Sequence, residues 1–344
     1  MKSIVGLSSL AVLCVIGTGL AFQQQQGASP PPPWAYGFAT PPSGDAGVQP
    51  AGRAGGGGGG GGGGRGAAPD TTKRTIVGSS ASFTLAQIRD GFGPADWFPG
   101  DHPQMPSIVA QGRRDANITA CALCHYPNGK GRPENAGVSG LPYAYFLQTM
   151  MDFKNDARKS ADPRKTNTNR MIAFAKAMTD DEIRAAATYF SSMKWTPWVK
   201  VVETDEVPKT RIAAGMFVPI EGADAGKEPI GQRIIEVPEN PEATEVLRNP
   251  RSSFVAYVPA GSIKKGEAIA TRGQCTLCHG ANLEGLGPVP GLAGRSPSYT
   301  VRQLYDMQRG VRTGTWSELM KRVVATMTPD DMLNVAAYTA SRAP

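Results

Sequence analysis

Two short cysteine–histidine motifs carry the chemistry of this 344-residue chain, Cys121-Ala-Leu-Cys124-His125 and Cys275-Thr-Leu-Cys278-His279. Both read C-x-x-C-H, the pattern that attaches haem covalently. Two thiols three positions apart lie about one helical turn apart, so they can form thioethers with two vinyl groups on one edge of a haem. The histidine that follows can then bind the iron as its proximal ligand. The motifs therefore predict two haem c groups for each chain.

Other chemistries of paired cysteines fit the pattern less well. The halves of a zinc ribbon lie about 15–20 residues apart, whereas Cys121 and Cys275 are separated by 275 − 121 = 154 positions. A thioredoxin-like dithiol needs a βαβ context, and the sequence around these motifs does not show one. The remaining cysteine, Cys14, lies in the apolar N-terminal stretch and is removed if that stretch is cleaved.

The second axial ligand of each iron can be inferred by elimination, because few histidines and cysteines remain available. It has three histidines, of which His125 and His279 are used, and the attachment reaction uses the four other cysteines. Methionine remains, and cytochromes c commonly use it. The third histidine, His102, lies beside a proline and is interpreted as an ordinary loop residue, with a distal-ligand or proton-handling role as the alternative.

Two pairs of methionines recur at the same distance from a helix start. Met178 and Met327 directly precede the N-cap threonines Thr179 and Thr328, at the staple position that packs against the fourth helical residue. They therefore have a structural role. Met171 and Met320 lie eight positions before the same threonines and have no such role, so we assign them as axial ligands. Met150, Met151 and Met307 lie in amphipathic stretches and are expected in the core.

The two haem motifs belong to an internal repeat. Matching positions recur at the same offset or close to it: Gly112 and Gly266, Ser139-Gly140 and Ala293-Gly294, Tyr145 and Tyr299, and the helix starts at Thr179 and Thr328. The first helix start is a capping box, and the second has a proline at the first helical position. The repeat predicts two similar helical domains, covering residues 82–196 and 258–344.

The segments outside the repeat differ in kind. Residues 1–21 have one lysine and then an uncharged apolar run, as in an export signal cleaved after Ala21; the alternative is an uncleaved membrane anchor over Ser3 to Phe22. Residues 22–81 are rich in proline and glycine and are predicted to be a disordered tether. Residues 197–257 contain short β-branched runs, at 232–237 and 253–258, that predict a few strands.

The haem segments resemble the tandem di-haem, class I c-type cytochromes of bacterial periplasms. The resemblance rests on the C-terminal haem motif, Gly287-Pro-Val-Pro-Gly-Leu-Ala-Gly294, Tyr299-Thr-Val-Arg-Gln-Leu and Met320 before Thr328-Pro-Asp-Asp. It implies a mostly α fold: two domains of three to four helices, each around a covalent haem, joined by an irregular segment with short strands. It supports Met171 and Met320 as ligands. It also implies that Pro290 contacts His279, whereas the first copy has Ala136 in that place.

The predicted function is electron transfer in the periplasm between redox partner proteins, through two haems with histidine and methionine ligands. An alternative is a haem subunit of a larger dehydrogenase or oxidase complex, and a di-haem peroxidase-type enzyme is favoured least, because methionine would fill each iron. The formal net charge of +7 could steer the chain onto acidic partners. Nucleic acid is not implied, because the signal directs export. Both interpretations of residues 1–21 place the rest of the chain outside the cytoplasm, either free or anchored to the membrane.

The two haems are expected to differ in reduction potential. Glu134 is close to the first motif in sequence, and the first copy has no proline matching Pro290. A carboxylate near a haem stabilises the ferric charge, and second-shell contacts and exposure also tune the potential. The sequence therefore predicts the lower potential at His125 and a better insulated haem at His279.

Overall fold

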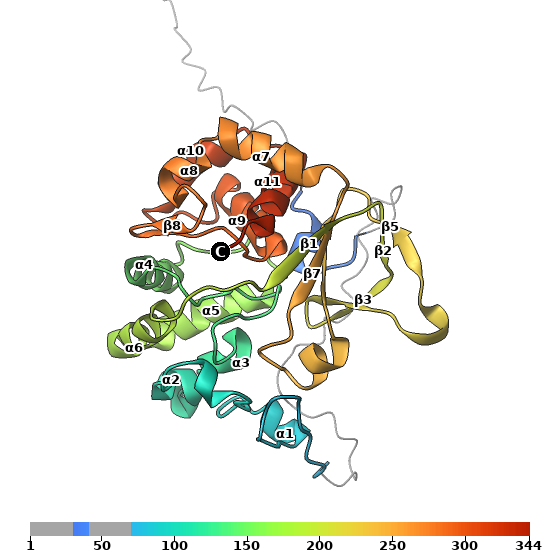
Figure 1. Ribbon diagram of the computed structural model, residues 1–344. Helices are drawn as coiled ribbons and strands as arrows, with labels where there is room; N and C mark the ends of the chain where they lie inside the picture. The colour runs from blue at the N-terminus through green and yellow to red at the C-terminus, as the bar shows by residue number, and fades with distance from the viewer. Residues whose placement is uncertain (1–29, 41–69) are drawn as a thin grey trace, which may run out of the picture. The chain divides into compact units, whose positions relative to one another are not determined.

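The computed structural model describes residues 30–40 and 70–344 (Figure 1), and its contacts group Pro31–Pro344 into one compact unit. The predicted export signal, its cleavage site and Cys14 lie outside the described residues. Within the described ranges, none of the helices has the length and hydropathy needed to cross a membrane.

The N-terminal haem motif lies in a helical half of the chain. Its helices are α2 (Ser107–Ala110), α3 (Cys121–His125), α4 (Tyr143–Lys154), α5 (Thr166–Ala177) and α6 (Asp180–Ser191). Thr179 caps α6 in a capping box with Glu182, as predicted. Apolar side chains of α4, α5 and α6 form one buried cluster with Ile108, Val109 and Ala122, so the short attachment helix α3 is held against this core.

The C-terminal half repeats this arrangement with α7 (Ser262–Arg272), α8 (Cys275–His279), α9 (Pro297–Gln308), α10 (Ser317–Val324) and α11 (Pro329–Ser341). Between α8 and α9, β8 (Gly285–Leu286) pairs antiparallel with β9 (Val289–Pro290). Thr328 caps α11 in a second capping box, with Asp331. The mostly helical fold with short strands that the sequence predicts is confirmed.

The two halves differ at the helix that precedes each motif. Gly266 lies inside α7, where an added Cβ would come within 2.0 Å of the Asn334 carbonyl oxygen on α11. The glycine therefore lets two helices cross closely. Gly112 follows the much shorter α2 and has φ +68°, a conformation that glycine adopts without strain. The matching glycines thus serve different purposes.

The segment between the halves forms strands. β1 (Val199–Glu203), β7 (Phe254–Val258) and β6 (Ile235–Pro238) make a three-stranded sheet in that order, with β1 parallel to β7 and β6 antiparallel to it. The runs at 232–237 and 253–258 therefore form strands, as predicted. Two two-stranded sheets pair β2 (Glu206–Pro208) with β5 (Lys227–Pro229) and β3 (Thr210–Ala213) with β4 (Met216–Pro219). The other elements are α1 (Leu85–Ile88), η1 (Pro33–Tyr36), η2 (Pro99–Asp101), η3 (Arg114–Ala116), η4 (Gly222–Asp224) and η5 (Glu242–Val246).

The strand segment contacts both haem-motif halves. Arg248 donates a hydrogen bond to the carbonyl oxygen of Leu123, between the two cysteines of the first motif. Glu236, which is almost completely buried, accepts a hydrogen bond of 2.8 Å from the hydroxyl of Ser296 at the start of α9. Burial raises the pKa of Glu236 to about 7, against the lowering effect of the serine hydrogen bonds. The segment is therefore packed between the two repeats and does not form a loose linker.

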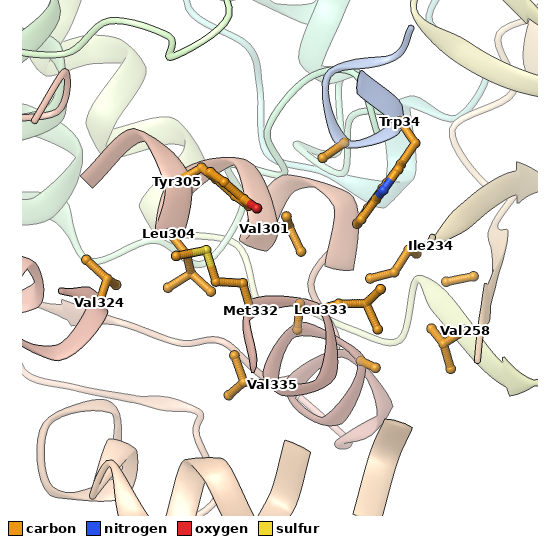
Figure 2. Close-up of a cluster of buried hydrophobic side chains, with 14 of the residues drawn as sticks. Trp34, Ile234, Val258, Val301, Leu304, Tyr305, Val324, Met332, Leu333 and Val335 are labelled. Atoms are coloured by element: carbon orange, nitrogen blue, oxygen red, sulfur yellow. The ribbon is translucent and has the colours of Figure 1, made fainter. Parts of the chain in front are cut away.

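The tether prediction is wrong for residues 33–36. They form η1, and Trp34, Ala35 and Tyr36 are buried in the same apolar cluster as α9 and α11 (Figure 2). Tyr36 donates a hydrogen bond of 3.0 Å to Asp306, and Arg302 donates one of 2.6 Å to the Ala35 carbonyl oxygen. Four residues are too few for a periodic pattern, but two aromatic side chains bury enough area to hold a short segment in place.

Residues 82–106, at the start of the first predicted domain, pack on two parts of the chain. Gly91 accepts a hydrogen bond from the Ala120 backbone, directly before the attachment helix α3. Trp97 donates a hydrogen bond of 2.8 Å to the Leu247 carbonyl oxygen in the strand segment. Residues 82–106 therefore join two parts of the chain.

The two halves meet through a self-complementary contact. Arg158 donates a hydrogen bond of 2.8 Å to the hydroxyl of Tyr299, and Arg312 donates one of 2.8 Å to that of Tyr145. The arginines are 312 − 158 = 154 positions apart, and so are the tyrosines (299 − 145). Arg158 and Arg312 also face each other as an isolated antiparallel bridge. Each repeat thus offers the same pair of side chains to the other, as in the interface of a twofold dimer.

Candidate haem sites

The first motif forms a single helical turn with its histidine oriented by the backbone. His125 Nδ1 lies 2.8 Å from the carbonyl oxygen of Ala136. A carbonyl only accepts, so Nδ1 carries the proton and Nε2 is free to bind a metal. Burial lowers the pKa of His125 and favours the neutral imidazole that metal binding requires. Burial also raises the pKa of the Cys121 thiol to about 12.

The second motif has the same geometry. His279 Nδ1 lies 2.8 Å from the carbonyl oxygen of Pro290, and burial lowers the pKa of this histidine too. The resemblance leaves the matching contact to His125 in doubt, because the first copy has Ala136 in place of proline. The structure has the same contact in both copies, because the acceptor is a backbone carbonyl, which alanine supplies as well as proline does.

The residue after each histidine adopts an unusual backbone conformation. Tyr126 has φ 61° and ψ 156°, and Gly280 has φ 87° and ψ 156°. Glycine adopts these angles readily, whereas a residue with a side chain is strained there, at a cost on the order of 1–3 kcal/mol. Tyr126 is almost completely buried, and the guanidinium of Arg248 lies 5.6 Å from its ring centre. Both copies therefore end the attachment helix with the same turn.

A cavity lies beside the first motif. It has a volume of about 150 Å³ and is partly open to solvent. Its walls include Cys121, Cys124, His125 and Met171, together with apolar side chains of α4 and α6 such as Phe146 and Phe190. Two thiols, a free imidazole nitrogen and a thioether sulfur around an apolar space fit a covalently bound haem.

Comparison with known proteins agrees with this geometry. The sequence pattern of the cytochrome c family, described as "Cytochrome c", matches residues 109–194. Cytochrome c-554(548) from Halomonas halodenitrificans is 32% identical over 71 residues, which cover 86% of that protein and 20% of this chain. The chain belongs to the cytochrome c family.

Other relatives match this cytochrome over larger or smaller shares of its length. A "Thiosulfate dehydrogenase electron acceptor" from Stutzerimonas stutzeri is 23% identical over 238 residues, 68% of this chain and 84% of that protein. Cytochrome c-552 from Acidithiobacillus ferridurans is 36% identical over 85 residues, and this chain spans only 36% of its length. Among solved structures, cytochrome c4 of Acidithiobacillus ferrooxidans is 22% identical with a TM-score of 0.40, covering 64% of this chain and 97% of that one.

The methionines of this cytochrome fall into two groups. Met171 and Met178 both line the first cavity, but Met178 also lies in the buried core with Ile183, the fourth residue of α6, as the staple position requires. In the second half, Met320 on α10 and Met327 are both partly buried against the C-terminal core. The assignment of Met171 and Met320 as ligands therefore stays a prediction.

The sequence predicts a better insulated haem at the second motif, and this stays a prediction. Leu277, between its two cysteines, is 67% exposed, and Cys278 is exposed as well. In the first motif Leu123 is half-buried, and Arg248 of the strand segment covers its carbonyl. The strand segment contacts only one attachment helix in this way, and the sequence did not show which one.

Glu134 is the carboxylate predicted to lower the reduction potential of the first haem, and neighbouring arginines offset its charge. Glu134 does line the cavity, but it is almost completely buried and forms an ion pair of 2.6 Å with Arg132. The guanidinium of Arg248 is a further positive charge in the same group. Arg132 and Arg248 therefore offset the charge of Glu134, and the lower potential at His125 stays a prediction.

A set of buried cations that the sequence analysis missed lines the same cavity. Arg158, Lys165 and Arg302 belong to it, and burial, followed by the charge of Arg302, lowers the pKa of Lys165 to about 7. Arg158 and Arg312 recur at the repeat offset of 154, so the repeat could have indicated them. No local pattern indicates Lys165 or Arg302.

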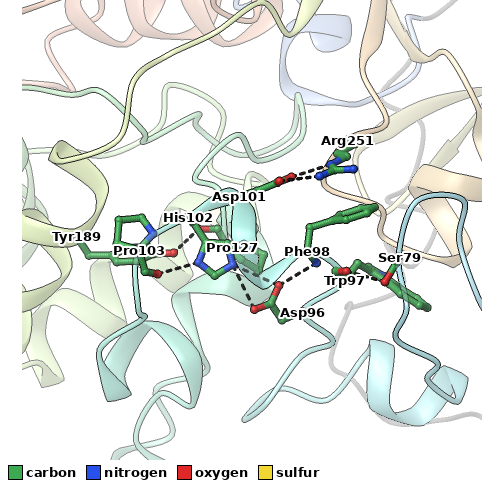
Figure 3. A network of polar contacts seen from close by, with 10 residues as sticks. All are labelled: Ser79, Asp96, Trp97, Phe98, Asp101, His102, Pro103, Pro127, Tyr189 and Arg251. Atoms are coloured by element: carbon green, nitrogen blue, oxygen red, sulfur yellow. Dashed lines mark hydrogen bonds and ion pairs between the residues drawn. The ribbon is translucent and has the colours of Figure 1, made fainter.

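His102 lies in a polar network with Asp96 and the backbone of Pro103 (Figure 3). Its Nε2 is 3.2 Å from Asp96 Oδ1 and its Nδ1 is 2.9 Å from the Pro103 carbonyl oxygen. Both partners only accept, so both nitrogens can donate only when the ring is protonated. Burial alone lowers the pKa of His102, but the hydrogen bonds to Asp96 and Pro103 outweigh it and raise the pKa above 6.5. The network favours the structural interpretation of this residue.

We expect His102→Gln to destabilise the folded protein mainly at acidic pH. Because the folded pKa is raised, the stabilisation is complete below about 6.5, the usual pKa of histidine, and is lost as the pH rises through the folded pKa. A hydrogen bond to a charged group contributes about 1.5–3 kcal/mol, so the loss at pH 5.5 should be of that order. Denaturant unfolding of both proteins at pH 5.5 and 9 measures it, and an equal loss at both pH values would contradict the assignment.

Proposed function

We propose that this chain is an exported electron carrier that binds two haem c groups and passes single electrons between redox partner proteins. One observation carries the proposal: both C-x-x-C-H turns hold the histidine Nδ1 2.8 Å from a backbone carbonyl oxygen eleven residues further along the chain. This leaves each Nε2 free to bind iron. The C-x-x-C-H pattern of both turns, and their separation of 154 positions, favour haem over a zinc ribbon or a dithiol.

Each side chain then has a defined role. Cys121, Cys124, Cys275 and Cys278 form the thioethers, and His125 and His279 bind the irons through Nε2. The backbone carbonyls of Pro290 and Ala136 accept a hydrogen bond from the histidine Nδ1–H and fix the ring. Met171 and Met320 supply the sixth ligands, which favour the ferrous state and raise the potential. The haem supplies the one-electron couple Fe(III)/Fe(II) when bound.

The buried cations fit the charged edge of a haem. Arg158, Lys165 and Arg302 line the first cavity and could pair with the two carboxylates that every haem c carries. Such pairing would also supply the counter-charge that buried cations need. The self-complementary contact between the halves uses Arg158 as well, so the cavity reaches the junction between the two repeats.

Partner proteins would exchange electrons at the second site. Leu277, between the two cysteines of that site, is exposed, whereas the strand segment contacts the first attachment helix. The formal charge of +7 would favour acidic partners with salt-dependent rates. We propose the periplasm as the location, from the export signal at residues 1–21.

A haem subunit of a dehydrogenase complex is the second candidate, because one relative is named as the electron acceptor of thiosulfate dehydrogenase. Size-exclusion chromatography of the native extract separates the two candidates. A free carrier elutes at the size of one chain, and a subunit elutes with a larger protein. A peroxidase would need an iron with a free coordination position. The proposed methionine ligands would occupy that position, so this role is disfavoured.

A spectroscopic redox titration of the purified protein tests the proposed function. We expect reversible uptake of two electrons per chain, with low-spin spectra in both oxidation states. A protein without reversible haem reduction, or one that consumes hydrogen peroxide rapidly as purified, would contradict a simple carrier.

A further inference from the structure

One buried arginine connects the two histidine sites. Arg295 comes directly after the Leu-Ala-Gly element of the second repeat and is 7% exposed. Its Nε donates a hydrogen bond of 2.9 Å to the carbonyl oxygen of Gly291. Its Nη1 donates one of 3.0 Å to Gly137, and its Nη2 donates one of 3.2 Å to Ser139. Arg295, a residue of the second repeat, thus binds the backbone of both repeats.

The two glycines occupy matching positions. They are 291 − 137 = 154 residues apart, the same offset as His125 and His279. Gly137 follows Ala136, and Gly291 follows Pro290, the two residues whose carbonyls hold the histidine rings. Arg295 therefore donates a hydrogen bond to the matching glycine in both acceptor loops, the loops whose carbonyls hold the histidine rings. In the first repeat the position matching Arg295 is Leu141, so a single guanidinium serves both sites.

The arrangement forms a continuous path between the irons' ligands. It runs from His125 to Ala136, along the backbone to Gly137, through the guanidinium to Gly291, and back through Pro290 to His279. Four hydrogen bonds of 2.8 to 3.0 Å join these groups.

The charge of Arg295 has no acidic partner among the residues that the structure describes, since all three of its hydrogen bonds go to carbonyl oxygens. It lies 4.4 Å from the ring centre of Trp195, and Lys130 Nζ lies 4.3 Å from the same centre. Burial, with a further contribution from Arg295, lowers the pKa of Lys130 to about 8. A buried positive charge that no carboxylate neutralises disfavours further positive charge nearby, and the ferric state carries one more charge than the ferrous state.

We propose that Arg295 is a positioning residue shared by both haem sites, which fixes the two histidine-acceptor loops and raises both reduction potentials. The proposal rests on the function proposed above, because it needs two bound haems. It predicts that one substitution in the second repeat changes the haem of the first repeat as well.

Arg295→Met should lower both potentials, while Arg295→Lys, which keeps the charge, should lower them less. At a fixed ambient potential we expect the ferrous-to-ferric ratio of each haem to fall on the order of tenfold, which is about 59 mV for a one-electron couple. The matched control is Arg184→Met, which removes the same charge from an exposed ion pair with Asp181 on α6 and should leave both potentials unchanged.

Potentials are measured by spectroscopic titration of haem-loaded protein, with haem content checked by intact mass. Two unchanged potentials in Arg295→Met, or a change at only one haem, would overturn the proposal. If this variant loses haem, Arg295→Gln decides by the same criterion, because it removes the charge and keeps an amide donor. A wild-type protein without covalent haem would instead refute the proposed function itself.

Discussion

Replacing Cys275 and Cys278 together with serine is expected to leave a protein with one covalent haem, and replacing Cys121 and Cys124 is expected to do the same. The thioether bonds need the two thiols of one helical turn, and α3 and α8 each supply such a pair. Serine keeps the size of the side chain but cannot form the bond. Intact mass should show two haems in the wild-type protein and one in each double variant.

Cys14→Ser is the control for this experiment. Cys14 belongs to the predicted export signal, so its replacement should leave the mature protein with two haems. Acid-acetone extraction gives an independent measurement, because covalent haem stays with the protein. Haem that extracts from the wild-type chain, or a double variant that still carries two haems, would contradict the attachment sites.

Met171→Ala should open the first haem to added ligands such as imidazole. Without the sulfur the iron loses a ligand that favours the ferrous state, so the ferrous-to-ferric ratio at a fixed potential should fall by at least roughly tenfold, or about 59 mV. The weak far-red band of sulfur-ligated ferric haem should lose half of its intensity. Met320→Ala should have the same effect at the second haem.

Met178→Ala is the matched control in the first half. Met178 packs with Ile183 in the core, so its truncation should lower the free energy of unfolding by about 2–5 kcal/mol, as in other core positions. The far-red band should persist. If Met178→Ala removes the band and Met171→Ala does not, the two methionines have the opposite roles, since both line the cavity.

The local features of this cytochrome could be predicted from the sequence. The spacing of cysteines and histidine within one turn specifies an attachment helix by itself. The capped helices α6 and α11 and the strands β6 and β7 also form where local signals place them. Each of these features depends on residues within a few positions of one another, so chain geometry alone determines them.

Contacts between distant segments were predicted poorly. The sequence placed Pro33–Tyr36 in a tether, whereas Trp34 and Tyr36 are buried against α9 and α11. It also treated Glu134 as an uncompensated charge, although Arg248 of the strand segment lies in the same charged group. The composition of a segment describes its average character. It does not show that two of its aromatic side chains, Trp34 and Tyr36, pack against helices more than 200 residues further along the chain.

The sequence by itself determined which residues can hold two haems, because attachment and proximal ligation need only one turn of helix. The tertiary structure decided how the two sites relate. It alone shows that Ala136 and Pro290 present equivalent backbone carbonyls to the two histidines. It also shows that a side chain of the strand segment binds a backbone carbonyl of the first attachment helix. Finally, it shows that Arg295 binds the acceptor loops of both repeats. These relations depend on how two repeats 154 residues apart pack together, and packing is set by the shape and charge of whole surfaces.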